Sequence, residues 1–137
     1  MPLVIDSSVA ASWGIPDESS PTAADALELV EKVPCEAPSI FWHELRNVLL
    51  VSERRGRLTV EETQRALSLV DDVGPTIDSL ASHESVMRLA RKHSLTAYDA
   101  AYLELALRLG APLATLDRRL AQAARNEGVT LVEAAAS

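Results

Sequence analysis

Four acidic residues stand where the sequence predicts the end of a strand or the start of a helix. Asp6 and Asp117 each end a short apolar run. Glu44 and Asp99 each fall in the first turns of a predicted helix. In a parallel α/β sheet, the carboxyl ends of the strands and the N-termini of the following helices share one edge, which carries the ligand crevice. The four carboxylates are therefore expected to converge there.

Such a cluster favours a bound divalent cation. Two carboxylates about 5 Å apart repel each other by about 3 kcal/mol at an effective dielectric constant of about 20, so bare acids raise their pKa values or move apart. Ligand sets made only of oxygen suit Mg²⁺ or Mn²⁺. No histidine or cysteine accompanies the acids at a spacing typical of zinc ligands. Several carboxylates, a hard metal ion and no obvious nucleophile indicate phosphodiester chemistry with water activated by the metal.

Each acid also has an ordinary structural explanation. Thr96 can cap the helix that carries Asp99, which then occupies the N3 position of a capping-box-like pattern. A carboxylate there gains up to about 1 kcal/mol from the helix dipole. Asp6 and Asp117 can cap the helices that follow them, and Glu44 can be a solvated helix residue. The joint arrangement of the four acids, and not any single one, favours a functional site.

Strands and helices alternate along the chain. The predicted strands are short apolar runs, and the helices have apolar residues at three- and four-residue spacing. The strands are expected at residues 2–6, 35–38, 75–78, 112–117 and 129–133, and the helices at 7–13, 20–33, 40–55, 59–72, 82–93, 97–109 and 118–128. This order predicts an α/β fold with a mainly parallel central sheet and helices on both faces.

Local signals mark several helix ends. Ser20 is an expected N-cap because Pro21 follows it at the first helical position. Ser39 is expected to cap the helix over 40–55, and Thr59 opens a capping box at the next helix. Gly110 is a typical residue just beyond a helix C-terminus.

Length and composition predict one globular domain. The chain has 137 residues, of which 47% are apolar and 24% charged. We expect the domain to span residues 1–133, followed by a short disordered tail, 134–137. The single cysteine excludes an intrachain disulfide and fits a reducing compartment, so a cytoplasmic location is expected. No apolar run approaches the roughly 18 residues of a membrane span, so no contact with a membrane is expected.

The net charge of −7 argues against a protein that grips nucleic acid by bulk charge. Local basic patches nevertheless occur at residues 53–57, 88–92 and 117–120. A solvated helix surface is the favoured explanation for each patch taken alone.

Four segments carry a resemblance that covers nearly the whole chain: "IDSSVAASWGIPDE", "APSIFWHELRNVL", "LTAYDAAYLELALRLGAPLATLD" and "RRLAQAARNEGVTLV". They contain, in order, D-x-S, E-x-x-N, T-x-x-D-A-x-Y and T-x-D. No single motif is specific, but the ordered set resembles the PIN-domain ribonucleases of the VapC toxin type.

The resemblance implies roles for particular residues. Asp6, Glu44, Asp99 and Asp117 match the acidic site of the family; Ser8, Thr115 and Asn47 match its supporting polar positions. It also implies an endoribonuclease that depends on Mg²⁺ or Mn²⁺, a homodimer, and a cognate VapB-like antitoxin that inhibits it. For an RNA substrate, the candidate contacts in the basic patches are Arg54, Arg55, Arg118 and Arg119.

The segment 40–51, "IFWHELRNVLLV", has more apolar surface than one helix face needs. Either this helix is buried centrally or one of its stripes meets a partner. Together with the resemblance, this favours an interface between two copies of the chain.

Other protein classes also place acids at strand ends. A response-regulator receiver needs a lysine near the site, and neither Lys32 nor Lys92 follows a strand suitably. A haloacid-dehalogenase-like phosphatase needs a second aspartate at the position that Ser8 occupies. Two alternatives stay open: a binding module for RNA or protein with an inactive metal site, and a housekeeping RNA-processing nuclease.

Overall fold

The computed structural model describes residues 2–16, 18 and 20–133. These residues form the strands β1 (Leu3–Ile5), β2 (Cys35–Pro38), β3 (Thr76–Asp78) and β4 (Leu113–Ala114), and the helices α1 (Ser7–Gly14), α2 (Pro21–Val30), α3 (Phe41–Arg54), α4 (Val60–Val73), α5 (His83–His93), α6 (Ala97–Leu109) and α7 (Arg118–Asn126). The tail expected at 134–137 lies outside the described residues.

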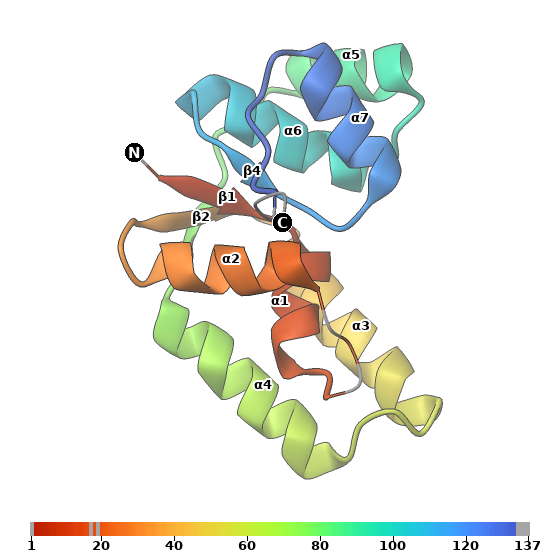
Figure 1. Ribbon diagram of the computed structural model, residues 1–137. Coiled ribbons are helices and arrows are strands. Elements are labelled where there is room, and N and C mark those ends of the chain that lie inside the picture. Colours follow the sequence, from red (N-terminus) through yellow and green to blue (C-terminus); the bar gives the residue numbers. More distant parts are fainter. Residues whose placement is uncertain (1, 17, 19, 134–137) are drawn as a thin grey trace.

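A parallel sheet with the strand order β3-β2-β1-β4 divides the described residues into two layers of helices. Helices α5, α6 and α7 lie on one side of the sheet, and α1 to α4 lie on the other (Figure 1). Helix α6 contacts β1, β2 and β4, whereas α2 contacts β1 and β4 from the opposite side. The predicted α/β fold with a parallel sheet and helices on both faces is confirmed.

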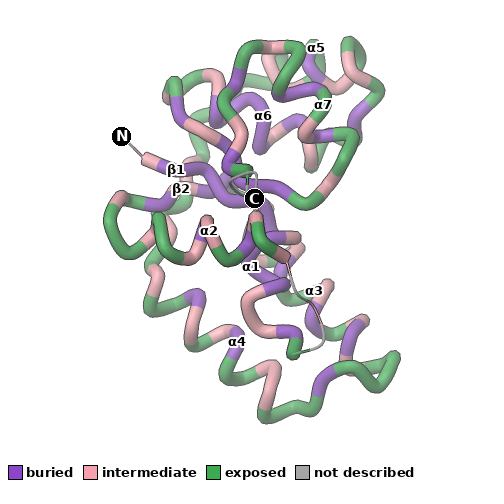
Figure 2. The backbone as a smooth tube through the Cα atoms, viewed as in Figure 1, coloured by how far each residue is buried: buried purple, intermediate pink, exposed green. Residues whose placement is uncertain are grey.

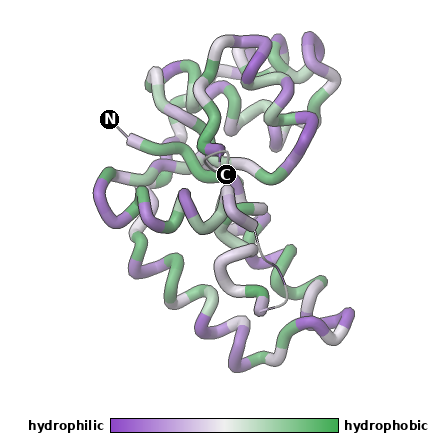
Figure 3. Tube along the Cα trace, viewed as in Figure 1, coloured by the Kyte–Doolittle hydropathy of each residue, from purple (hydrophilic) through white to green (hydrophobic). Residues whose placement is uncertain are grey.

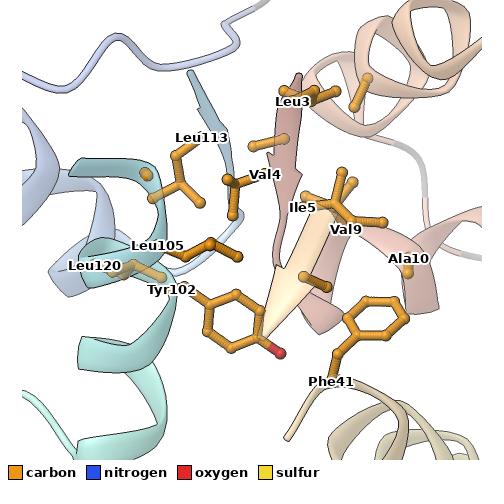
Figure 4. Close-up of a cluster of buried hydrophobic side chains, with 14 of the residues drawn as sticks. Leu3, Val4, Ile5, Val9, Ala10, Phe41, Tyr102, Leu105, Leu113 and Leu120 are labelled. Carbon is orange, nitrogen blue, oxygen red and sulfur yellow. The ribbon is translucent and has the colours of Figure 1, made fainter. Parts of the chain in front are cut away.

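The sheet's central strand anchors the hydrophobic core. All residues of β1 are buried, and the backbone is coloured as buried along this strand (Figure 2). Because side chains alternate across a strand, Val4 points toward Leu113 and Leu105, while Leu3 and Ile5 point to the opposite face (Figure 4). Strand β1 therefore joins the two halves of the core, and its carboxyl end emerges from the centre of the sheet.

Helices on the outer side of the molecule are amphipathic. Along α4 the tube alternates between hydrophilic and hydrophobic colours (Figure 3). Ala66 and Val70 of this helix are buried. This periodicity is typical of a helix with one face on the core and the other in water.

Most of the predicted capping residues are confirmed. The side chains of Ser20, Thr59 and Thr96 each accept a hydrogen bond from a backbone N–H in the first turn of α2, α4 and α6. At Thr59 the capping box is complete, and Gly110 is left-handed with φ 61° at the end of α6.

Two predictions about the elements are wrong. Ser39 does not cap α3, because this helix begins one residue later, with Ile40 at the N-cap position and no side-chain cap. The strand expected over 129–133 is reduced to a single parallel bridge between Leu131 and Leu113. β4 itself has two residues, so it offers little backbone for a further strand to pair with.

A charged network fastens the edge of the sheet to α6. Arg108 donates hydrogen bonds to Asp78, at the end of β3, and to the buried carboxylate of Glu104, with N···O distances of 2.7 and 2.6 Å. The guanidinium holds the pKa of Asp78 below its ordinary value. The network thereby fixes one long side of α6, whose N-terminus carries Asp99.

Helices α1 and α4 approach closely because Gly14 has no side chain. A Cβ built at Gly14 would overlap the Cβ of Ala66 and lie 3.2 Å from its Cα. We expect Gly14→Ala to reduce the free energy of unfolding by about 1 to 3 kcal/mol, since the helices must separate. Chemical denaturation of the variant measures this loss.

The matched test transfers the methyl group from residue 66 to residue 14, so that the number of methyl groups between the two helices stays the same. Ala66→Gly in the Gly14→Ala background restores the space, so the double variant is expected to be more stable than the sum of the two single effects predicts. Additive effects would show that the α1–α4 contact does not limit this position.

Candidate functional site

Asp6 stands at the carboxyl end of β1 and is buried. Its carboxylate accepts hydrogen bonds from the hydroxyls of Thr115 (2.7 Å), Ser8 (2.9 Å) and Ser7 (3.3 Å). Burial raises the pKa of Asp6, and the bonds from Thr115 and Ser8 oppose that rise. Asp6 occupies the N-cap position of α1, as the capping interpretation expected, but its carboxylate makes no capping hydrogen bond there.

The hydroxyls of Ser8 and Thr115 also join the ends of β1 and β4. Oγ of Ser8 accepts a hydrogen bond from the N–H of Leu116 (3.1 Å), and Oγ1 of Thr115 accepts one from the N–H of Asp117 (3.0 Å). Each hydroxyl therefore donates to Asp6 and accepts from the β4–α7 loop. This pairing fixes Asp6 relative to the start of α7.

Glu44 lies in the first turn of α3 and is partly buried. The hydroxyl of Tyr102, on α6, donates a hydrogen bond to Oε1 of Glu44 at 2.7 Å. Burial raises the pKa of Glu44, and the negative charges of Asp6 and Asp99 raise it further, while the bond from Tyr102 lowers it. Tyr102 is completely buried and extends from α6 into the core close to Phe41 (Figure 4).

Asp99 occupies the first turn of α6, where its N–H donates to the hydroxyl of Thr96 at 3.1 Å. Burial raises the pKa of Asp99 to about 6, and the charges of Asp117 and Asp6 contribute to the rise. Asp99 is thus influenced by Asp117 and Asp6, and Glu44 by Asp6 and Asp99. The four carboxylates lie close enough to interact electrostatically at one edge of the sheet.

Asp117 is the N-cap of α7. Its Oδ1 accepts a hydrogen bond from the N–H of Leu120 at 2.9 Å. The capping interpretation of this residue is therefore confirmed. Capping does not conflict with the charge that Asp117 presents to Asp99.

The other candidate residues lie at different distances from the acids. Asn47 is exposed on α3, about one turn beyond Glu44. Arg54 and Arg55 lie at the opposite end of that helix, about 15 Å along its axis at 1.5 Å per residue.

Arg118 and Arg119 directly follow Asp117 in the first turn of α7. They line different cavities. Arg118 faces a cavity of about 420 Å³ that Thr115 and Asp117 also line, whereas Arg119 faces a cavity of about 400 Å³ between α5 and α7.

Among the described residues, no group of three or more His, Cys, Asp or Glu side chains is already placed to hold a metal ion. The four acids have no ion pair with a basic side chain in the described part of the chain. Within the described residues, hydroxyl groups and helix N-termini are what offset their negative charge.

Tyr102 takes part in this site, although it was given no role among the residues predicted from the sequence. It lies on the same helix as Asp99, three residues later, and so on the same side of α6. The hydrogen bond from Tyr102 to Glu44 therefore connects α6 to α3. The position of Tyr102 in the T-x-x-D-A-x-Y motif is the signal that could have identified it.

No helix within the described ranges combines the length and the apolar character needed to cross a bilayer.

Comparison with known proteins agrees with this architecture. Residues 3–126 match the family described as PIN domain, and all four acids fall in this range. Ribonuclease VapC3 of Pyrobaculum aerophilum is 33% identical over 128 residues, which cover 89% of this chain and 94% of that protein. The crystal structure of PAE2754 from the same organism superimposes with a TM-score of 0.72 at 23% identity, over 96% of this chain and 84% of that one, and shows the same fold.

Proposed function

This chain belongs to the PIN domain family, and from that premise we propose that it is an endoribonuclease dependent on Mg²⁺ or Mn²⁺, the toxin of a VapBC-type pair. The observation that carries the proposal is the cluster of Asp6, Glu44, Asp99 and Asp117, which has no basic partner among the described residues. Burial, and then the charges of neighbouring acids, raise the pKa values of Glu44 and Asp99. Similarity to Ribonuclease VapC3 supports the choice of RNA as substrate.

The cluster fits a hard divalent cation. Its donors are carboxylate oxygens, the ligands that Mg²⁺ and Mn²⁺ prefer. Burial raises the pKa values of Asp6, Glu44 and Asp99, and neighbouring acids add to the rise at Glu44 and Asp99, so a cation would favour the charged form of all three. Mg²⁺ usually keeps several waters and binds through one or two carboxylates together with substrate phosphates, so the cluster need not supply three ligands at once.

When bound, the ion would act as a Lewis acid on the scissile phosphate and lower the pKa of the attacking water. The chain's own residues would orient the cluster. Thr115 and Ser8 hold the buried carboxylate of Asp6, and Tyr102 holds that of Glu44. Asp99 and Asp117 sit at helix N-termini, where the helix dipole stabilises their negative charge.

Residues around the cluster would contact the RNA strand. Asn47, exposed one turn beyond Glu44, is a proposed supporting donor. Arg118 and Arg119 are the proposed phosphate contacts next to Asp117. Arg54 and Arg55, at the distant end of α3, form a second proposed patch.

The direct test is cleavage of single-stranded RNA by the purified protein, with millimolar Mg²⁺ or Mn²⁺ and with EDTA. We expect endonucleolytic products only with the metal ion. RNA that stays intact with either ion, while the protein is folded, would favour a binding module with an inactive metal site.

The toxin role requires an inhibitor. We propose a VapB-like antitoxin as the partner, because the relative named above is a VapC protein. If a small protein is encoded beside this gene, its co-expression with this chain should give a co-purifying complex that does not cleave RNA. Cleavage unaffected by that protein would point instead to a housekeeping RNA-processing nuclease.

We also propose that the protein is a homodimer that uses α3. Phe41, Leu45 and Leu49 of this helix are buried, but Leu50 remains 43% exposed. Light scattering at micromolar concentration is expected to give about 30 kDa, twice the chain mass of 14.8 kDa. Leu50→Glu should shift the mass to that of the monomer, because a dimer interface would bury the new charge.

Leu80→Glu provides the matched control for the dimer. Leu80 is 78% exposed and lies outside α3, so this variant should keep the mass of the parent protein. A parent protein that scatters as a monomer over the whole concentration range would overturn the proposal.

A further inference from the structure

We propose that the cavity between α5 and α7 binds a phosphate group of the RNA strand, beside the acidic cluster. This inference rests on the proposed ribonuclease function and adds a substrate-binding site to it. The cavity has a volume of about 400 Å³ and is lined by Lys92, His93, Ser94, Arg119, Gln122, Ala123 and Asn126.

The lining is rich in hydrogen-bond donors and contains no carboxylate. The basic side chains come from two helices, Lys92 and His93 from the end of α5 and Arg119 from the start of α7. Nε2 of Gln122 donates to Oδ1 of Asn126 at 3.1 Å, which leaves the amide nitrogen of Asn126 available as a donor. A ligand with several acceptor oxygens and negative charge, such as a phosphodiester, matches this set.

The charge balance around the cavity is positive. Glu127 lies behind Lys92 and His93 and contacts both at 2.7 Å. The single negative charge of Glu127 is therefore outnumbered by the positive charges of Lys92 and Arg119, beside the ring of His93. Arg119 makes no hydrogen bond or ion pair with the described residues, so its charge is free to meet a ligand.

Short stretches of chain connect the cavity to the acidic cluster at both of its helices, although none of the four acids lines it. Arg119 comes two residues after Asp117, in the same turn of α7. Ser94 comes two residues before Thr96, the N-cap of the helix that carries Asp99. The end of α5 and the starts of α6 and α7 lie on the same side of the molecule (Figure 1). A strand that passes between Asp99 and Asp117 can therefore place a neighbouring phosphate in the cavity.

The test compares two cavity variants with two matched controls. Arg119→Ala removes the cation that has no partner among the described residues, and Gln122→Glu places a carboxylate in the cavity with little change of shape. Arg91→Ala removes an exposed arginine from α5 outside the cavity, and Gln64→Glu adds the same charge on α4. Affinity for a fluorescent single-stranded RNA is measured by anisotropy in EDTA at several salt concentrations, so that no cleavage is needed.

We expect each cavity variant to bind RNA roughly 3- to 10-fold more weakly, and Arg119→Ala to reduce the salt dependence by about one phosphate contact. The controls should stay within about 1.5-fold of the parent protein. If the parent cleaves RNA but the cavity variants bind like the controls, the cavity proposal fails and the ribonuclease proposal stands.

The other outcomes separate the two proposals in the opposite direction. If the parent does not cleave RNA but binds it with the expected dependence on the cavity, the ribonuclease proposal fails and the phosphate site stands. If the parent neither cleaves nor binds RNA, both fail. Inorganic phosphate is titrated in parallel: phosphate binding that depends on Arg119, without any effect of the variants on RNA affinity, would identify a site for small anions and overturn the RNA assignment.

Discussion

Glu44→Gln is expected to reduce Mg²⁺-dependent RNA cleavage by at least about 100-fold while the protein stays folded. Loss of an outer contact at a metal site already costs about 10- to 100-fold, and Glu44 is a proposed direct ligand. The glutamine keeps the shape of the side chain, and its Oε1 can still accept the hydrogen bond from Tyr102. Because burial and the charges of Asp6 and Asp99 raise the pKa of Glu44, a neutral side chain should not reduce stability. Initial cleavage rates and thermal melting measure both effects.

Glu53→Gln is the matched control for this variant. It makes the same chemical change on the same helix, near its other end, and should leave both the rate and the melting temperature unchanged. A Glu44→Gln protein that cleaves RNA at nearly the parent rate would remove Glu44 from the reaction. One that melts far below the parent would show that Glu44 serves mainly the fold.

Much of the fold could be predicted because its signals are local. Ser20 with Pro21, and Thr59 with Glu62, are short patterns that satisfy the free N–H groups of a helix start whatever the rest of the chain does. Alternation of strands and helices then determines a parallel sheet, because each parallel connection needs a crossover.

The wrong predictions concern places where contacts distant in the sequence, or the geometry of a turn, override the local sequence signal. Ser39 has a favoured capping side chain, but the turn after β2 starts α3 one residue later. The apolar segment 129–133 looks like a strand, yet its pairing depends on β4, which is too short to extend beyond one bridge. Strand length in a sheet depends on the partner, and the partner is not visible in the segment itself.

The acidic site illustrates the same limit. Its general position followed from the topology, because the ends of β1 and β4 must share one edge with the starts of α3 and α6. The hydrogen bonds that hold the individual carboxylates could not be predicted from the topology. The bond from Tyr102 to Glu44 joins residues 58 positions apart, and the bond from Thr115 to Asp6 joins residues 109 positions apart. Their partners depend on how the layers pack.

Asp99→Asn should make the metal-free protein as stable as the parent or more stable at pH 7 to 8, and this difference should vanish near pH 4. The pKa of Asp99 is raised from 3.8 to about 6 in the folded state. The folded state therefore binds the proton more tightly than the unfolded state. The stability that this proton contributes is complete below pH 4 and is lost as the pH rises through about 6. Asparagine does not titrate and so avoids that loss.

The size of the effect follows from the shift. Two pKa units correspond to about 3 kcal/mol at most, and solvent screening on the open side of the crevice reduces this to about 1 to 2 kcal/mol. Asp99→Asn also weakens the interaction of the side chain at position 99 with the dipole of α6, by up to about 1 kcal/mol. The net change at neutral pH should therefore range from none to a gain of about 2 kcal/mol for Asp99→Asn.

Millimolar Mg²⁺ should reverse this order. An ion that binds the folded state stabilises it by mass action, and the parent, with its full set of carboxylates, gains more than Asp99→Asn. Melting of both proteins between pH 4 and 8, with Mg²⁺ or with EDTA, measures the prediction, and a cleavage measurement beside it should give only background for Asp99→Asn. Suppose instead that Asp99→Asn melts well below the parent in EDTA, gains equally from Mg²⁺ and still cleaves RNA. Asp99 would then act only at the start of α6, through the helix dipole, and the cation would have to be held by the other acids.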